Sequence, residues 1–266
     1  MQLSIGEHTV AVRVEGNSSP AVLFAHSTGM GSIQWVRAAR TLAPRRCVMP
    51  DFLGYGASSA APGRRKDWRV DLEALVQLAC AQDAPVTVVG HSYGGFLALQ
   101  LARHHPERVA RVVVHEPVLW GTLRSGGDAT VVETFEALVA RMRAVERGGE
   151  AWLEGFVDFW NGPGMWAKLP SSRADQWRRD GAHIAAEVHG LIDDTTPHTT
   201  WSSLQMPVLL TVGENTASIE SHVCDVLQGV LPNGTRRQVP GGHMAPLTNG
   251  RSWLDAVVPW MTRDDS

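Results

Sequence analysis

The sequence predicts an α/β protein: a mostly parallel sheet with helices on both faces, interrupted by an inserted helical cap. Short apolar and β-branched runs alternate with helical patterns up to about residue 117, and the alternation resumes at about residue 201. Such alternation is typical of parallel sheets that are covered on both faces. Between these regions only helical patterns and loops occur. We therefore expect a core formed by residues 1–117 and 201–266 and a cap formed by residues 118–200.

The first part of the core contains strand patterns separated by helical ones. Gly6 to Thr9 indicates a hairpin turn between the first two strands, Ser32 is a candidate helix cap, and Asp67 opens an amphipathic helix. The strands are expected at Leu3–Ile5, Val10–Val14, Ala21–Ala25, Cys47–Pro50, Val86–Val89 and Val109–His115. The helices are expected at Ile33–Leu42, Trp68–Ala81 and Phe96–Ala102.

The rest of the chain first loses and then regains the strand–helix rhythm. The cap is expected to contain helices at Val131–Arg147, Glu150–Trp160 and Arg173–His189. The second part of the core is expected to contain strands at Pro207–Val212 and Thr235–Val239 and helices at Ser218–Val230 and Arg251–Met261.

Composition excludes several classes of function. A chain of 266 residues with 44% hydrophobic residues and a net charge of -3 has no electrostatic reason to bind nucleic acid or an anionic membrane. It shows neither an export signal nor an apolar run long enough to span a membrane, so we expect a cytoplasmic protein with a small-molecule substrate. Cys47, Cys80 and Cys224 lack the spacing of a disulfide framework or a zinc site. The sequence leaves open whether the protein is a monomer or a homodimer.

A Gly-x-Ser-x-Gly pattern from Gly90 to Gly94 lies between the strand at Val86–Val89 and the helix at Phe96–Ala102. So sharp a turn strains its central residue, and glycine at the flanking positions lets strand and helix pass without a Cβ clash. The pattern alone is weak because glycine and serine are common in loops. The strand–turn–helix context favours the interpretation that Ser92 is a nucleophile at the tip of the turn.

A serine nucleophile needs a base, and the base needs a carboxylate to orient it. Of the eleven histidines we select His243, because it lies in a glycine-rich loop directly after the last predicted strand. His91 occupies a variable position of the turn, where its side chain is expected to point away from the reaction and pack. No histidine pair has the spacing of a catalytic metal site, and we expect neither a metal nor a cofactor. Ordinary surface or packing roles are expected for His104, His105, His183, His189, His198 and His222.

With these pieces in place, the chain resembles the α/β-hydrolase family over nearly its whole length. The matching segments are His26-Ser27-Thr28-Gly29, the turn from Asp51 to Ser58, Gly90-His91-Ser92-Tyr93-Gly94-Gly95 and Gly241-Gly242-His243. The resemblance implies an oxyanion hole formed by the backbone N–H groups of Tyr93 and Ser27, in a loop where many relatives have glycine in place of Ser27. Asp51 is expected to hold loop backbone and to take no part in catalysis.

The acid departs from the commonest pattern of that family. Most relatives carry an Asp a few residues after the strand that corresponds to Pro207–Val212, and here Thr216 occupies that place. A minority, including haloalkane dehalogenases and zearalenone lactonases, carries the acid after the preceding core strand, where this chain has Glu116. We therefore select Glu116, with Glu214 as the main rival and Glu220 as a remote one. A serine at the turn argues against dehalogenase and epoxide hydrolase chemistry, which use an aspartate nucleophile in this family.

Six of the ten tryptophans lie in the predicted cap or at its edges. Some of these rings are expected to line a lipophilic or aromatic pocket between cap and sheet, and the others to pack in the core. The six are Trp120, Trp152, Trp160, Trp166, Trp177 and Trp201, of which the first five are our pocket candidates.

Three functions are compatible with these residues. The leading hypothesis is a serine hydrolase that cleaves a carboxylic ester or lactone through an acyl-enzyme on Ser92. The second keeps the same residues but uses His243 as a base on the substrate, as in C–C bond hydrolases, cofactor-free dioxygenases and lyases. The third is a ligand receptor built on a hydrolase scaffold, which would show very slow turnover.

Overall fold

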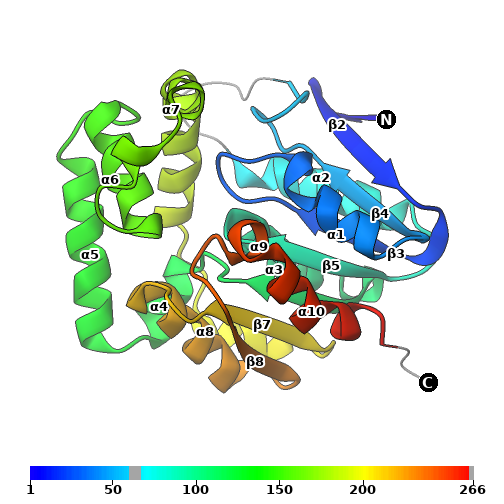
Figure 1. Ribbon diagram of the computed structural model, residues 1–266. Helices are drawn as coiled ribbons and strands as arrows, with labels where there is room; N and C mark the ends of the chain where they lie inside the picture. The colour runs from blue at the N-terminus through cyan, green and yellow to red at the C-terminus, as the bar shows by residue number, and fades with distance from the viewer. Residues whose placement is uncertain (60–66, 264–266) are drawn as a thin grey trace.

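Within residues 1–59 and 67–263, which the computed structural model describes, eight strands form one sheet in the order β1-β2-β4-β3-β5-β6-β7-β8 (Figure 1). The pairs β1–β2 and β2–β4 are antiparallel, and every later pair is parallel. This confirms the predicted mostly parallel sheet. The strands are β1 (Gln2–Ile5), β2 (His8–Glu15), β3 (Ser18–Ala25), β4 (Arg45–Pro50), β5 (Val86–His91), β6 (Val109–His115), β7 (Val208–Gly213) and β8 (Gly234–Val239).

Helices cover both faces of the sheet because successive side chains of a strand point to opposite faces. In β3, Leu23 belongs to the hydrophobic cluster that contains α2 and α3, and Phe24 belongs to the cluster that contains α1 and α10. Trp35 and Trp253 are buried in the latter cluster. The helices of the core are α1 (Val36–Thr41), α2 (Trp68–Cys80), α3 (Tyr93–His104), α8 (Ser218–Val230), α9 (Ala245–Thr248) and α10 (Gly250–Met261).

The segment between β6 and β7 is helical. Figure 1 shows α5, α6 and α7 standing beside the sheet, and α4, α5 and the 3-10 helix η4 contact α8 of the core. The first helix of this segment, α4, therefore lies against the core. The elements of this segment are α4 (Trp120–Gly126), α5 (Ala129–Arg143), α6 (Glu150–Asn161), η3 (Trp166–Lys168), α7 (Ser171–Ile192) and η4 (His198–Ser203).

The structure corrects the sequence prediction in two places. The helix predicted at Ile33–Leu42 begins as the 3-10 helix η1 (Ser32–Trp35) and only then becomes α1. Ser32 does not cap it, because Gly31 holds that position and the Ser32 N–H donates to Oδ1 of Asp51. The short helices α4 and α9 have no counterpart in the prediction. Within the described residues, none of the helices has the length and apolar character needed to cross a membrane.

Candidate active site

Ser92 lies at the turn between β5 and α3, in the backbone conformation that the sequence predicts. Its φ of 55° is in the left-handed region, which is unfavourable for a residue with a side chain. The turn is tight: a Cβ at Gly90 would collide with the carbonyl of Gly94, and a Cβ at Gly94 would collide with the carbonyl of Ala25. These contacts explain why glycine is required on both sides of Ser92.

Glu116 and His243 meet at the carboxyl end of the parallel strands. Glu116 follows β6, His243 follows β8, and Nδ1 of His243 lies 2.8 Å from Oε2 of Glu116. The other oxygen, Oε1, accepts hydrogen bonds from the N–H of Gly213 and the hydroxyl of Thr216. Both side chains are buried. The carboxylate is thus held by donors on both oxygens.

The surroundings keep Glu116 ionised. Burial alone would raise the pKa of this carboxyl. The hydrogen bond from His243, the positive charges that His115 and His243 carry when protonated, and the Thr216 hydroxyl together lower the pKa to about 2. An ionised carboxylate at Nδ1 fixes the tautomer of His243 and leaves Nε2 as the nitrogen that can accept a proton.

The rival acids lie in unsuitable environments. Glu214 is exposed, and its backbone N–H donates to the carbonyl of Val239. Glu220 is buried in α8, where burial and then the charge of Glu116 raise its pKa well above the usual range, so that it stays protonated. Asp51 accepts hydrogen bonds from the backbone N–H groups of Ser32 and Ala57, the loop-holding contacts expected of it.

The loop after β3 corrects one expected contact. The N–H of Ser27, expected to face the reacting oxygen, instead donates to Oε1 of Gln34 at 3.0 Å, and the Ser27 hydroxyl donates to the same atom. The next amide, that of Thr28, has no hydrogen-bond partner within residues 1–59 and 67–263, and Thr28 lines the cleft beside Ser92. Tyr93 is the first residue of α3, directly after Ser92, as expected.

Two further histidines are buried beside His243. The ring of His91 lies 4.9 Å from that of His243 and 5.4 Å from that of His115, measured between centroids. Burial lowers the pKa of His91 well below its usual range, and burial lowers that of His115 to about 4 although Glu116 acts in the opposite direction. Both rings are therefore neutral. His91 packs as expected, but it also bonds Gln34, a contact that the sequence does not reveal.

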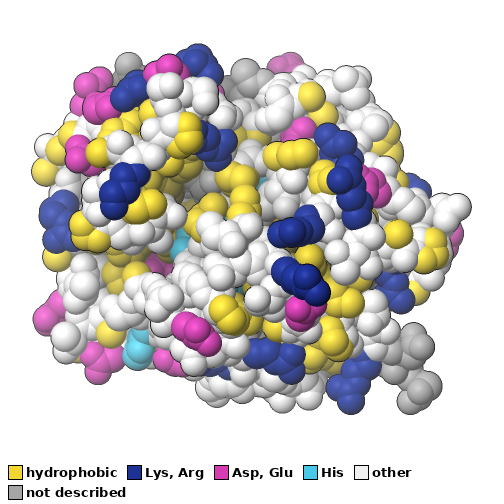
Figure 2. All heavy atoms as spheres, in the orientation of Figure 1, with side chains coloured by type: hydrophobic (Ala, Val, Ile, Leu, Met, Phe, Trp, Pro, Cys, Tyr) yellow, Lys and Arg dark blue, Asp and Glu magenta, His cyan; other side chains and the backbone are white. Residues whose placement is uncertain are grey.

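A cleft of about 150 Å³ contains both Ser92 and His243 in its walls. Helices α6 and α7 form its roof, and Figure 2 shows the surface hollowed between the helices of the cap and the rest of the molecule, with hydrophobic side chains gathered there. The volume is below the roughly 300–1,000 Å³ typical of pockets for drug-sized ligands. The remaining lining residues are Ser27, Thr28, Met30, Phe156, Val157, Trp160, Asn161, Met165, Leu169, Arg173, Trp177 and Met244.

Two of the five tryptophans predicted for the pocket lie in this lining, Trp160 and Trp177. Trp160 stacks on the ring of His243 with centroids 3.8 Å apart. The prediction is wrong for the other three, which are buried elsewhere. Trp120 packs on Phe135, Trp152 stacks on Phe156, and Trp166 donates its indole N–H to Glu150. Trp201, the sixth ring, donates to the hydroxyl of Thr122 in the core.

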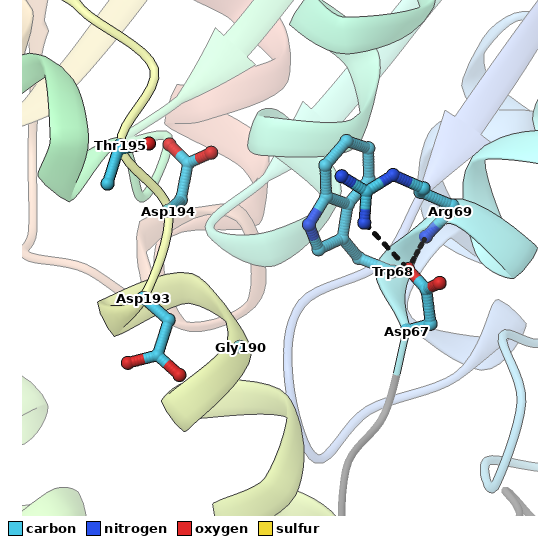
Figure 3. A pocket seen from close by; sticks show the side chains of 7 residues that line it. All are labelled: Asp67, Trp68, Arg69, Gly190, Asp193, Asp194 and Thr195. Carbon is cyan, nitrogen blue, oxygen red and sulfur yellow. Dashed lines mark hydrogen bonds and ion pairs between the residues drawn. The ribbon is translucent and has the colours of Figure 1, made fainter.

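A larger groove of about 500 Å³ lies between the start of α2 and the end of α7 (Figure 3). Its carboxylates are already engaged: Asp67 pairs with Arg69, and Asp194 bonds Thr196. Neither Ser92 nor His243 lines it, so the smaller cleft is the candidate active site. Within the described residues no group of three or more His, Cys, Asp or Glu is arranged to hold a metal ion.

Comparison with known proteins agrees with this architecture. The family model described as "alpha/beta hydrolase fold" matches residues 20–148. Among solved structures, the enol-lactonase from Burkholderia xenovorans superposes with a TM-score of 0.77 at 17% identity, covering 99% of this chain and 100% of that one. An esterase from Exiguobacterium antarcticum superposes with a TM-score of 0.70 at 16% identity, covering 96% of each chain. The chain therefore has the α/β-hydrolase fold.

Curated relatives are similar over part of the chain. The lipase LipV from Mycobacterium tuberculosis is 40% identical over 147 residues, which are 52% of this chain and 54% of that protein. A 2-hydroxymuconate semialdehyde hydrolase from Pseudomonas putida is 38% identical over 104 residues, 38% of this chain and 37% of that protein. The chain thus spans about half or less of the length of these relatives.

Proposed function

We propose that this protein is a serine hydrolase that cleaves a carboxylic ester or lactone of a small lipophilic or aromatic substrate. The observation that carries the proposal is that Ser92 and His243 line one cleft while Glu116 holds Nδ1 of His243 at 2.8 Å. A nucleophile, a base and an orienting carboxylate are the parts that acyl transfer needs.

In the first half of the reaction, Nε2 of His243 takes the proton of the Ser92 hydroxyl as the oxygen attacks the carbonyl carbon. The negative charge that develops on the carbonyl oxygen is stabilised by the backbone N–H groups of Tyr93 and Thr28. Thr28 replaces Ser27 in this role because the Ser27 amide is occupied by Gln34. His243 then gives its proton to the leaving alcohol, and the acyl group stays on Ser92.

In the second half, a water molecule gives a proton to His243 and attacks the acyl carbon. Collapse of the tetrahedral intermediate releases the carboxylic acid and returns the proton to Ser92. Glu116 remains ionised throughout and stabilises the imidazolium that forms twice in the cycle. Its low pKa, about 2, supports this role at neutral pH.

The cleft supports a small, predominantly apolar substrate. Phe156, Leu169 and Trp177 contribute apolar surface from the cap, and the volume of about 150 Å³ excludes long acyl chains from full enclosure. The names of the relatives, lipase and enol-lactonase, support hydrolysis of an ester or lactone as a class.

C–C bond hydrolysis is the second candidate, because a relative is named 2-hydroxymuconate semialdehyde hydrolase. It would use the same histidine as a base on the substrate, and the serine would be less essential. The two reactions can be separated by measuring turnover of an ester and of a vinylogous diketo acid by Ser92→Ala, because C–C cleavage should depend less on the serine than ester hydrolysis does.

The test is a panel of aryl esters, alkyl esters and lactones assayed on the wild type and on Ser92→Ala. We expect a burst of product from an activated aryl ester in the wild type and a loss of turnover in the variant. Undiminished ester turnover by Ser92→Ala would refute the mechanism. Very slow turnover of every substrate, combined with ligand-induced stabilisation, would instead indicate a receptor.

A further inference from the structure

Among the described residues, Arg173, on α7, is the single Arg, Lys, Asp or Glu that lines the cleft. Its guanidinium reaches from the cap to the loop after β3, where it donates to the carbonyl of Gly29 at 3.0 Å and contacts Sδ of Met30. A third contact goes to Oε1 of Gln176. This loop also carries Thr28, so the cation lies at the end of the cleft where the substrate carbonyl is expected to bind.

The charge of Arg173 has no counterion in the part of the chain that the structure describes. Within residues 1–59 and 67–263, no carboxylate lies within ion-pair distance of it. Arg178, on the same helix, shows the contrast, because it pairs with both Glu150 and Asp175. Burial lowers the pKa of Arg173, and only the more distant charge of Asp180 acts in the opposite direction. A partly buried cation without a partner is unfavourable unless an anion completes it.

Within the described residues, not all N–H groups of the Arg173 guanidinium donate a hydrogen bond. Arginine carries five N–H groups in a planar fork, and Arg173 donates hydrogen bonds to two carbonyl-type oxygens and one sulfur atom. The Nε–H group and one N–H of Nη1 remain, and a carboxylate that accepted from them would form charge-assisted hydrogen bonds. A structural arginine that only bridges cap and core would not need to line the cleft that contains the nucleophile.

We infer that Arg173 binds a carboxylate of the substrate, so that the preferred substrate is a small ester or lactone that carries a second, ionised carboxyl group. The inference rests on the proposed function for the reaction and adds the substrate class. The apolar walls hold the body of the substrate, Ser92 attacks the ester carbonyl, and Arg173 fixes the charged end.

The experiment uses two matched ester pairs. In the first, the acyl part carries the charge: para-nitrophenyl hydrogen glutarate against para-nitrophenyl pentanoate. In the second, the leaving group carries it: para-acetoxybenzoate against its neutral methyl ester. We expect the wild type to prefer the charged member of at least one pair by about 10- to 100-fold in kcat/KM, the range of a charge-assisted hydrogen bond. Arg173→Gln should abolish this preference, and Arg173→Lys should keep part of it.

Arg179→Gln is the matched control, because Arg179 is exposed on the same helix and its loss changes the net charge equally. It should retain the wild-type preference. Turnover of the neutral ester reports whether each variant is folded and active. A wild-type ratio near one in both pairs, or a preference that survives in Arg173→Gln, would overturn the inference while leaving the hydrolase proposal intact.

If none of the four esters is turned over in a Ser92-dependent way, the hydrolase proposal fails. The anion site is then tested by binding, without catalysis. Calorimetric titration with glutarate should then show binding to the wild type that is at least tenfold weaker in Arg173→Gln. Equal binding by the two proteins would refute the carboxylate site.

Discussion

The hydroxyl of Thr216 donates to one carboxylate oxygen of Glu116, while the other oxygen lies 2.8 Å from Nδ1 of His243. Thr216 stands where the family resemblance leads one to look for the acid. The strand ends that carry these residues are adjacent because β6 pairs with β7. The side chain that replaces the missing acid therefore helps to hold the acid supplied by the neighbouring strand.

Replacing Glu116 with Gln should lower kcat for an aryl ester by about 100- to 10,000-fold, because the amide stabilises neither the tautomer nor the imidazolium. Glu214→Gln is the matched control, since Glu214 is exposed and follows the next strand. It should leave kcat unchanged. Steady-state kinetics on both variants decides the matter, and a collapse of kcat in Glu214→Gln alone would transfer the role to that residue.

Thr216→Val should lower kcat about tenfold. It should also raise the pH at which the protein loses the stability that ionised Glu116 contributes. The valine removes a donor from the Glu116 carboxylate, leaving the Gly213 N–H and His243, so the pKa of Glu116 rises toward its ordinary value. Thr216→Ser keeps the hydroxyl and should behave like the wild type. Equal kcat in the Val and Ser variants would show that the hydroxyl is dispensable.

The elements that could be predicted are those with a strong local signal. The central parallel strands such as β5 and β7 are buried, mostly apolar runs, and the turn at Ser92 requires glycines at fixed positions, so both can be predicted from the sequence. The choice of Glu116 came from the family resemblance and from the absence of an acid at Thr216. The short helix α9 has only four residues, too few for a helical period to be visible.

Contacts between distant segments could not be predicted, because no local pattern encodes them. Gln34 lies in η1 and bonds the loop at Ser27, so nothing in its neighbourhood marks it as part of the site. Tryptophan composition predicted aromatic burial but not which rings face the cleft. Trp160 reaches His243 only because the end of α6 lies over the loop after β8.

The stability of the protein should fall as the pH decreases from 6.5 to 4, in part because of His115. Its pKa is about 4 in the folded protein, below the ordinary 6.5, so the folded state binds fewer protons than the unfolded state in this interval. Its contribution is complete above pH 6.5 and is lost as the pH falls through 4.

The loss assigned to His115 amounts to about 3 kcal/mol. Urea unfolding at pH 7 and pH 4.5 measures it, with His115→Gln as the comparison. The variant should lose less stability between these pH values than the wild type, although His91, whose pKa is also lowered, still contributes to both. An identical loss in the two proteins would mean that His115 is not held neutral by burial.

Substitution of Trp160 should weaken substrate binding, whereas substitution of Trp152 should lower the stability of the protein. Trp160→Leu removes a wall of the cleft and the ring stacked on His243, so KM for aryl esters should rise about 5- to 10-fold. Trp152→Leu removes a fully buried ring outside the cleft and should lower the free energy of unfolding by about 1–3 kcal/mol without changing KM. Kinetics and thermal unfolding of both variants test this contrast. A rise of KM in Trp152→Leu without one in Trp160→Leu would contradict the cleft described above.

Gln34 should act as a positioning residue for the oxyanion loop. Its Oε1 accepts from the N–H and hydroxyl of Ser27, and its Nε2 donates to Nδ1 of His91, so it ties that loop to β5. Gln34→Leu leaves these groups unpaired and frees the Ser27–Thr28 backbone to move away from the reacting oxygen.

We expect kcat of Gln34→Leu to fall by about 10- to 100-fold while KM changes little, because the oxyanion contact is made mainly in the transition state. Gln34→Glu keeps the acceptor for Ser27 and should recover part of kcat. A purely structural role would lower the unfolding temperature of both variants without this split between kcat and KM. Parallel losses of kcat in Leu and Glu variants of equal thermal stability would show that the bond to Ser27 does not matter.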